Sequence, residues 1–301
     1  MDCQLLDESL FRKKSKEEKV PFENLITIVV LEDILKKIYD SEYADYFLIK
    51  NSVVLSSCTY RNKMNRRLTF CIRETKSFLY KKSEIGCIFA KLFRNIKKDC
   101  IHWNYNITEK KIKDKAENRA EFFVNIIATV FSVQIPVEIR IEKYREENML
   151  SVQKEILLKF ALKEKLSLNC YPSEGIVAEK FLNIIDKLEL LSDLSDYMEL
   201  YQILKTEQLS GRKISELLME GCKDNGIEVT QQRFDILLSY YKNSYMMKKW
   251  KSYLRHEKRK EPKWEDVIEI VGLSFQNIWD SLCKNVIYMG DWMPELGRYI
   301  D

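Results

Sequence analysis

The sequence predicts an α+β protein, in which an N-terminal mixed sheet with helices is followed by a C-terminal helical domain. The chain has 301 residues, and 46% of them are hydrophobic, so it can bury one large core or two smaller ones. It contains only 8 glycines and 5 prolines, which favours many helices and few long loops. The apolar period changes from strand-like to helical near residue 172, and we therefore expect one domain over 1–172 and another over 173–301.

The first domain is expected to mix helices with strands. It opens with a charged run, RKKSKEEK, that indicates a solvated or frayed start. Apolar residues then follow helical spacing, and later segments rich in β-branched and aromatic residues predict strands. In chain order, we expect a helix over 21–39, a strand-turn-helix or a strand pair over 46–57, a strand over 66–73, a helix over 83–98, strands over 100–108, 119–131 and 134–144, and a closing segment over 166–172.

The second domain is expected to be helical throughout. Every segment after Ser173 has the apolar period of a helix, and Pro172 stops the last segment of the first domain. The boundary is therefore a change of period and not a flexible linker. The expected helices cover 173–190, 193–208, 210–225, 230–244, 245–256 and 264–285.

The charge balance restricts any nucleic-acid contact to a local patch. The chain has 50 basic and 46 acidic residues and a net charge of +4, so it is no general polycation. The segment 246–263 has eight basic residues against two acidic ones, interleaved with Trp250 and Tyr253, and this combination fits a phosphate backbone with stacking platforms. The alternative is a solvated helix whose aromatic side belongs to the core. The candidate nucleic-acid residues are Lys248, Lys249, Lys251, Arg255, Lys258, Arg259 and Lys260.

Cysteine usage and the lack of long apolar runs indicate where the protein works. The 8 cysteines are scattered, without a CxxC pair, and the chain has only 2 histidines. Zinc sites and disulfide frameworks therefore have little support, and we expect reduced, mostly buried thiols and no metal site of this kind. The N-terminus lacks the apolar core of a signal peptide, and no apolar run approaches the roughly 18 residues of a membrane helix. These features predict a soluble, cytoplasmic protein without a membrane partner.

Two stretches, in the same order, resemble a known family. The first is YFLIKNSVVLSS over 46–57, followed by RRLTFCIR over 66–73, and the second is YPSEGIVAEKFLNIIDKLELLSDLSDYMELYQIL over 171–204. Together they are similar to the AbiEii/AbiGii-type nucleotidyltransferase family, the toxin half of certain bacterial abortive-infection and toxin–antitoxin pairs. The resemblance spans about residues 24 to 285 and implies that 1–172 is a nucleotidyltransferase-like domain.

The resemblance implies roles for particular residues. Lys50 matches the family's phosphate-side lysine, and Asp196 and Glu199 match two acids that open a helix. The i,i+3 spacing of the two acids predicts that they share one face of that helix. Asn51 and Ser52 stand where the family has a glycine pair, which lets the backbone approach a triphosphate. A pocket between the two domains is expected to bring these residues together. The implied nucleotide-binding residues are Asn51, Ser52, Arg73, Arg140 and Lys180.

The family's metal-binding motif is replaced in this chain. Where the family carries Asp-x-Asp, the sequence reads Cys71-x-Arg73, on the face of the expected strand opposite Leu68 and Phe70. Magnesium prefers carboxylate oxygens, whereas a thiol is a poor ligand and a guanidinium repels the ion. The third carboxylate that such folds place on a neighbouring strand would be Glu138 or Glu142. Arg73 and Arg140 could bind phosphate directly, or each could simply pair with one of these glutamates.

The leading hypothesis is an AbiEii-like toxin–antitoxin or phage-defence protein in which Lys50, Asp196 and Glu199 are vestigial catalytic residues. Such a pseudoenzyme would need no cofactor and would bind a nucleotide, an RNA such as tRNA, or a partner protein. The resemblance implies an antitoxin or a neighbouring subunit of a defence complex as that partner. The alternative is an active nucleotidyltransferase that modifies RNA or protein with Mg²⁺ and a nucleoside triphosphate at an altered metal site. A third hypothesis is a structural scaffold in a larger defence complex.

Overall fold

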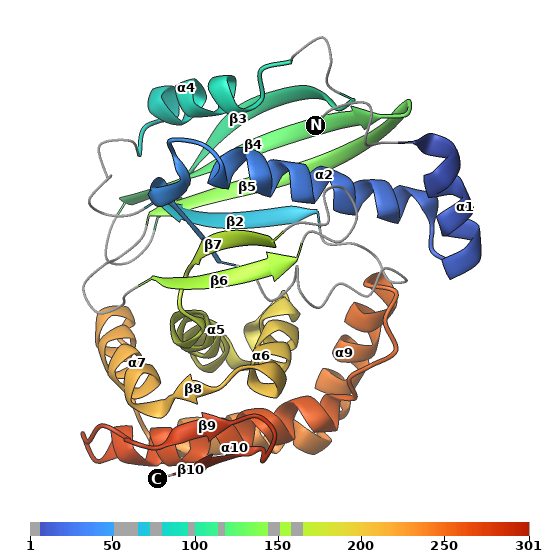
Figure 1. The fold of residues 1–301 in the computed structure, drawn as a ribbon. Coiled ribbons are helices and arrows are strands. Elements are labelled where there is room, and N and C mark those ends of the chain that lie inside the picture. Colours follow the sequence, from blue (N-terminus) through green and yellow to red (C-terminus); the bar gives the residue numbers. More distant parts are fainter. Residues whose placement is uncertain are drawn as a thin grey trace. The chain divides into compact units, whose positions relative to one another are not determined.

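The computed structural model describes residues 7–50, 66–72, 80–95, 100–113, 118–143, 151–157 and 165–300 (Figure 1). The chain divides into two compact units, Met1–Tyr171 and Pro172–Asp301, which we describe one after the other. The first contains a seven-stranded mixed sheet with helices, and the second is mainly helical, so the predicted α+β class is confirmed. None of the helices described is long and apolar enough to cross a bilayer.

The sheet of the first unit mixes parallel and antiparallel strands in the order β3-β4-β5-β2-β1-β7-β6. The central strand β2 runs parallel to β5, and β1 runs parallel to β7, while the other neighbours are antiparallel. Strands far apart in sequence therefore lie side by side at the centre of the sheet. The strands are β1 (Phe47–Ile49), β2 (Arg67–Ile72), β3 (His102–Lys113), β4 (Asn118–Val130), β5 (Val133–Lys143), β6 (Val152–Leu157) and β7 (Lys165–Cys170).

Helices cover one face of this sheet. The long apolar helix α2 (Phe22–Tyr39) lies across it, and α4 (Lys82–Leu92) lies beside β3 (Figure 1). Their buried side chains form one core with inward residues of the strands, including Phe47 and Phe70, whose rings meet edge to face with their centroids 5.9 Å apart. The short 3-10 helix η2 (Ala44–Tyr46) leads from α2 into β1.

The charged start of the chain forms a helix, in contrast to the frayed segment that the sequence suggested. Helix α1 (Glu8–Glu18) begins at Asp7, whose carboxylate accepts the backbone N–H of Ser9 at 2.8 Å. An i,i+4 ion pair joins Arg12 to Glu8. A side-chain cap and alternating charges therefore stabilise a segment whose composition alone indicates only solvent exposure.

The side chains of strand β2 alternate between the two faces of the sheet. Its residues Leu68, Phe70 and Ile72 point into the helix-covered core, while Thr69 and Cys71 point to the opposite face. The period-2 pattern of the sequence predicted this alternation. Polar side chains of β4 and β5 share the face of Thr69 and Cys71, because directly paired residues lie on the same side of a sheet.

The second unit is built around its longest helix, α10 (Trp264–Cys283). Phe181 of α5 stacks on Phe275 of α10 with their ring centroids 3.7 Å apart, and Trp279 meets Phe181 edge to face. This aromatic packing buries the facing sides of several amphipathic helices. The other elements are α5 (Ser173–Lys187), η4 (Leu188–Leu190), α6 (Ser195–Thr206), α7 (Gly211–Asn225), α8 (Gln231–Ser239), η5 (Tyr240–Lys242) and α9 (Ser244–His256).

The prediction that this unit is helical throughout is wrong at a small antiparallel sheet. It consists of β8 (Leu209–Ser210), β9 (Asp291–Met293) and β10 (Arg298–Ile300), in the order β10-β9-β8. Trp292 of β9 is fully buried and donates its indole N–H to the Leu204 carbonyl at 2.8 Å. Strands of two or three residues are too short to show alternation in the sequence, and β8 pairs with β9 from about 80 residues away in the chain.

Candidate functional site

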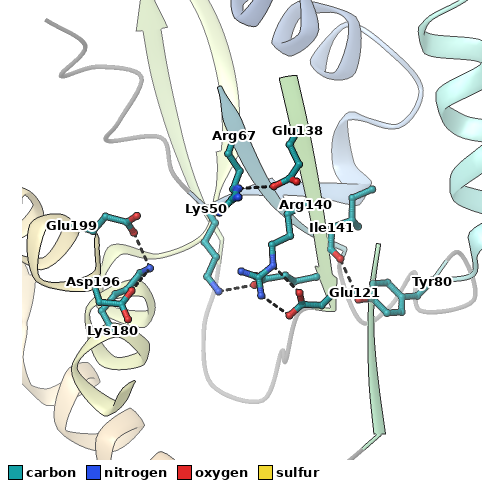
Figure 2. Close-up of polar contacts among 11 residues, drawn as sticks. Lys50, Arg67, Tyr80, Glu121, Glu138, Arg140, Ile141, Lys180, Asp196 and Glu199 are labelled. Carbon is teal, nitrogen blue, oxygen red and sulfur yellow. Dashed lines mark hydrogen bonds and ion pairs between the residues drawn. The ribbon is translucent and has the colours of Figure 1, made fainter. Parts of the chain in front are cut away.

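The predicted site residues that the structure describes form two polar clusters, one in each unit (Figure 2). In the first unit, Lys50 follows β1 directly, and its backbone N–H donates to the Thr69 carbonyl of β2 at 2.8 Å. Its ammonium Nζ lies 2.8 Å from Glu142 Oε2 of β5, as an ion pair between side chains that are 14% and 17% exposed. Because β2 separates β1 from β5, this ion pair spans the strand that carries Cys71.

The register of β2 and β5 distinguishes between the two candidate glutamates. Cys71 is the direct partner of Glu142, whereas Glu138 is the partner of Arg67. Arg67 donates its Nε to Glu138 at 2.5 Å, and the Arg67 side chain is 61% exposed. Glu138 therefore belongs to a surface ion pair, and Glu142 is the carboxylate beside the position where the family carries an aspartate.

Arg140 completes the first cluster as an ion-pair partner. Its Nε lies 3.1 Å from Glu142 Oε1 and 2.9 Å from Glu121 Oε2, and its second nitrogen also donates to Glu121. Arg140 thus pairs with Glu142, one of the two glutamates that the sequence offered, and its role in binding phosphate stays a prediction. Glu121, on β4, was missed from the sequence, because its contact with Arg140 depends on the pairing of β4 with β5, in which Phe123 lies opposite Arg140 and Glu121 lies two residues before Phe123. Two cations and two carboxylates leave the cluster without net charge.

Two tyrosines border this cluster. Tyr80 donates its hydroxyl to the Ile141 carbonyl at 3.2 Å, and its ring meets Phe122 edge to face. Burial, followed by the nearby carboxylates of Glu121 and Glu142, raises the pKa of Tyr80 far above its ordinary value. The Tyr80 hydroxyl therefore remains a donor at any physiological pH. On the other side, the ammonium of Lys50 lies 5.0 Å from the centre of the Tyr171 ring, a cation–π contact.

Three predicted site residues of this domain, Asn51, Ser52 and Arg73, lie outside the described residues. Their roles stay predictions. Cys71, the residue in place of the first metal-binding aspartate, is buried with 1% of its surface exposed. The expectation of a buried strand cysteine is therefore confirmed for this residue.

The second cluster joins two helices of the second unit. Lys180 of α5 places its Nζ 2.7 Å from Asp196 Oδ1 and 2.9 Å from Glu199 Oε2, both on α6 (Figure 2). Asn183, one turn after Lys180, also donates to Asp196. The spacing of Asp196 and Glu199 predicted that the two acids share a face, and both do face the same ammonium. Glu179, which precedes Lys180, is exposed.

The electrostatics of the second cluster depend on Lys180. Burial by itself would lower the pKa of Lys180, but Glu199 and Asp196 outweigh that effect and raise the pKa above its ordinary value. Asp196 lies in the first turn of α6, where the helix dipole favours a negative charge. One cation faces two carboxylates, and the predicted functional residues here are arranged as a salt-bridge network.

The basic segment divides into buried and exposed parts. Trp250 is 1% exposed and donates its indole N–H to the Pro262 carbonyl at 2.9 Å, so the aromatic side of the segment belongs to the core. Lys249 is half-buried and donates to the Leu191 carbonyl, which gives it a structural role. Arg259 is also half-buried. The exposed members of the predicted set are Lys248, Lys251, Arg255, Lys258 and Lys260.

The first cluster does not fit the magnesium ions that the family resemblance implies. Within the part of the chain that the structure describes, no group of three or more His, Cys, Asp or Glu side chains is placed to hold a metal ion. At the position of the motif, Cys71 pairs across the sheet with Glu142, whose carboxylate is neutralised by Lys50 and Arg140. A divalent ion at this position would face Lys50 and Arg140 at close range, which is unfavourable.

The structure thus defines a mixed α+β protein with a charge-balanced polar cluster on one sheet face. No family model and no curated protein matches the chain. Among solved structures, it is similar to JHP933 from Helicobacter pylori, with a TM-score of 0.49 and 14% identity over 88% of this chain and 96% of that one. A second H. pylori structure, described as a presumed nucleotidyltransferase, is similar with a TM-score of 0.48 and 13% identity over 88% of this chain and 98% of that one. At these scores the likeness carries no argument about function.

Proposed function

We propose that the chain is a nucleotidyltransferase-like protein of the AbiEii type that transfers no nucleotide and acts by binding another molecule in a toxin–antitoxin or phage-defence system. One observation carries the proposal. The carboxylate beside the lost metal-binding position, Glu142, is neutralised by Lys50 at 2.8 Å and by Arg140 at 3.1 Å. The motif segments quoted above support the family assignment, and this ion-pair network supports the loss of catalysis.

The chemistry of phosphoryl transfer explains why this network matters. Two-metal transfer needs carboxylates that converge on both ions, which stabilise the attacking and the leaving oxygens. Here the strand position holds Cys71, and the neighbouring acid already has two cationic partners. An ion pair of this kind is worth about 4 kcal/mol in gross attraction at a separation of about 4 Å near a protein surface. A metal ion would have to displace both cations and then remain beside them, since each is anchored in the sheet.

The same network disfavours a nucleotide as the bound molecule. Lys50 and Arg140, the predicted phosphate contacts in the described part, both face carboxylates. The four charged side chains that the structure describes in this cluster sum to zero, so a triphosphate would gain little attraction from them and would be repelled by Glu121 and Glu142. We therefore expect the functional contact to be made by another surface, with an RNA, an antitoxin or a neighbouring defence protein as the partner.

Incubation of the purified chain with each α-labelled nucleoside triphosphate, Mg²⁺ and total RNA tests the proposal. No label above background is expected in RNA or protein, while an active nucleotidyltransferase treated in parallel must incorporate label. The Lys50→Ala and Asp196→Ala variants should then give the same background as the unchanged protein. Incorporation that disappears in either variant would show a working centre, and the alternative of an active enzyme with an altered metal site would replace the proposal.

A further inference from the structure

Helix α9 differs from other charged helices of the chain because its own residues include no acidic side chain. Its sequence, SYMMKKWKSYLRH, contains four basic residues besides His256. In α1, by contrast, Arg12 lies 2.6 Å from Glu8, and in α7 Arg212 lies 2.9 Å from Glu216. Ordinary solvated helices in this protein thus interleave the two signs of charge. The positive charge of α9 is concentrated on one element and is not balanced within it.

The exposed side of α9 arranges these charges in a stripe. Met246, Trp250 and Leu254 recur every four residues and bury one side of the helix. The opposite side, offset by half a turn, carries exposed Lys248, Lys251 and Arg255. Lys258 and Lys260 extend the exposed basic set beyond the helix end, and the acidic members of the segment, Glu257 and Glu261, also follow the helix. The 13 residues of the helix make the stripe about 20 Å long.

An exposed aromatic ring stands at the start of this stripe. Tyr245, in the first turn of α9, is 59% exposed, and the ammonium of Lys249 lies 5.8 Å from the centre of its ring. Helical spacing places Tyr245 and Lys248 on neighbouring positions of the outward face. Trp250, which the sequence suggested as a stacking platform, is buried and cannot take this role. Tyr245, unlike Trp250, therefore has an accessible ring face, and this face lies beside the basic side chains of the stripe.

Like charges three or four residues apart weaken a helix by a few tenths of a kcal/mol for each pair, and α9 carries such pairs at 248/251 and 251/255. An anionic partner would relieve this repulsion. We propose that the stripe binds the phosphate backbone of a single-stranded nucleic acid and that Tyr245 stacks on one of its bases. A groove-reading duplex contact would not require the exposed ring, because bases inside a duplex are already stacked. The inference does not depend on whether the Lys50 cluster is catalytically silent.

Binding of the full chain to a fluorescent single-stranded RNA of 20 nucleotides, followed by anisotropy at several salt concentrations, tests the proposal. In the Lys248→Glu/Lys251→Glu/Arg255→Glu variant, affinity should fall at least about tenfold, and the slope of log K against log salt should become shallower by about 2, since each lost contact removes about 0.7 from it. The matched control reverses Arg212, Lys213 and Lys223 of α7, which are the same residue types and equally exposed. It should bind as the unchanged protein does.

The aromatic part of the proposal has its own variant. Tyr245→Ala should weaken binding about five- to a hundredfold, which corresponds to about 1–3 kcal/mol for a stacked base, and Tyr245→Phe should restore it. A DNA strand of the same sequence tells whether the site discriminates RNA from DNA, and a duplex should bind more weakly than either strand. Equal losses in the α7 control, or binding of polyglutamate with the same affinity as RNA and no effect of Tyr245→Ala, would overturn the proposal in favour of a non-specific surface or an acidic protein partner.

Discussion

The cluster around Lys50 and the cluster around Lys180 use the same types of side chain but reach different electrostatic states. In the first unit, two cations and two carboxylates cancel, and Glu142 has both Lys50 and Arg140 as partners. In the second unit, Lys180 is the cation that the structure pairs with both Asp196 and Glu199, and Asn183 adds a hydrogen bond to Asp196. Loss of one cation from the first cluster therefore leaves Glu142 with another, whereas loss of Lys180 removes the cation that both acids of the second cluster share. The difference teaches that two ion-pair networks built from similar side chains can depend to different degrees on a single residue.

The largest effect is expected from Lys180→Met. The substitution leaves Asp196 and Glu199 facing each other without a cation, and Asp196 is only 8% exposed. Breaking such a pair should cost about 2 to 4 kcal/mol of unfolding free energy, less than for a fully buried pair because Glu199 is partly solvated. Urea unfolding at neutral pH measures the loss, and Lys180→Arg, which keeps the charge, is the control. A loss below about 1 kcal/mol would show that water or the helix dipole satisfies the acids without Lys180.

A smaller effect is expected from Lys50→Met. Glu142 keeps Arg140 as a partner, so the cost should be about 1 kcal/mol by the same unfolding measurement. The double variant Lys50→Met/Arg140→Met removes both partners and should cost more than the sum of the single variants. A larger loss in Lys50→Met than in Lys180→Met would reverse the comparison between the two clusters.

The free energy of unfolding should fall at high pH, and part of this fall should be due to Lys180. Its pKa is raised in the folded protein, so its contribution is fully present below the ordinary lysine value of about 10.4 and is lost as the pH rises through the folded value. Buried tyrosines with raised pKa values, such as Tyr80 and Tyr197, add to the same decline. The part due to Lys180 is therefore the difference between the unchanged protein and Lys180→Met above pH 10. Parallel curves for the two proteins would assign the decline to the tyrosines alone.

The smallest effect is expected when Mg²⁺ is added and the melting temperature is measured. Millimolar Mg²⁺ should leave the melting temperature of the unchanged protein within error, because a ligand stabilises a protein only by binding its native state. Replacement of Cys71 and Arg73 by Asp should create a Mg²⁺-dependent rise, provided that Lys50→Met is added to release Glu142. A rise of several degrees in the unchanged protein would contradict the misfit between this cluster and a divalent ion.

Local pattern was enough to predict the main helices and the long strands, but not the partners of the charged residues. Period-2 alternation placed Cys71 on the face opposite Leu68 and Phe70, and the structure agrees. The choice of Glu142 over Glu138 depends on the parallel pairing of β2 with β5, whose paired residues lie 71 positions apart in the chain. No local periodicity encodes such a register, so the sequence left both glutamates open.

The second unit shows the same limit. The i,i+3 spacing predicted that Asp196 and Glu199 share a face, because both residues lie on one helix. That Lys180 is their partner follows from the packing of α5 on α6, which is a tertiary contact. The pattern of the basic segment around Trp250 allowed both a nucleic-acid face and a core face. The burial of Trp250 assigns its ring to the core, and the exposed lysines stay candidates.

The ion pair between Lys50 and Glu142 has a consequence for the thiol beneath it. The pair spans β2 on the side that carries Cys71, whose exposed fraction is 1%, whereas Cys87 and Cys283 are exposed. An alkylating reagent or peroxide must reach a sulfur atom to react with it, and a buried thiol stays protonated and inert. Chemical damage to the cysteines that the structure describes should therefore begin at Cys87 and Cys283 and reach Cys71, at the centre of the sheet, later.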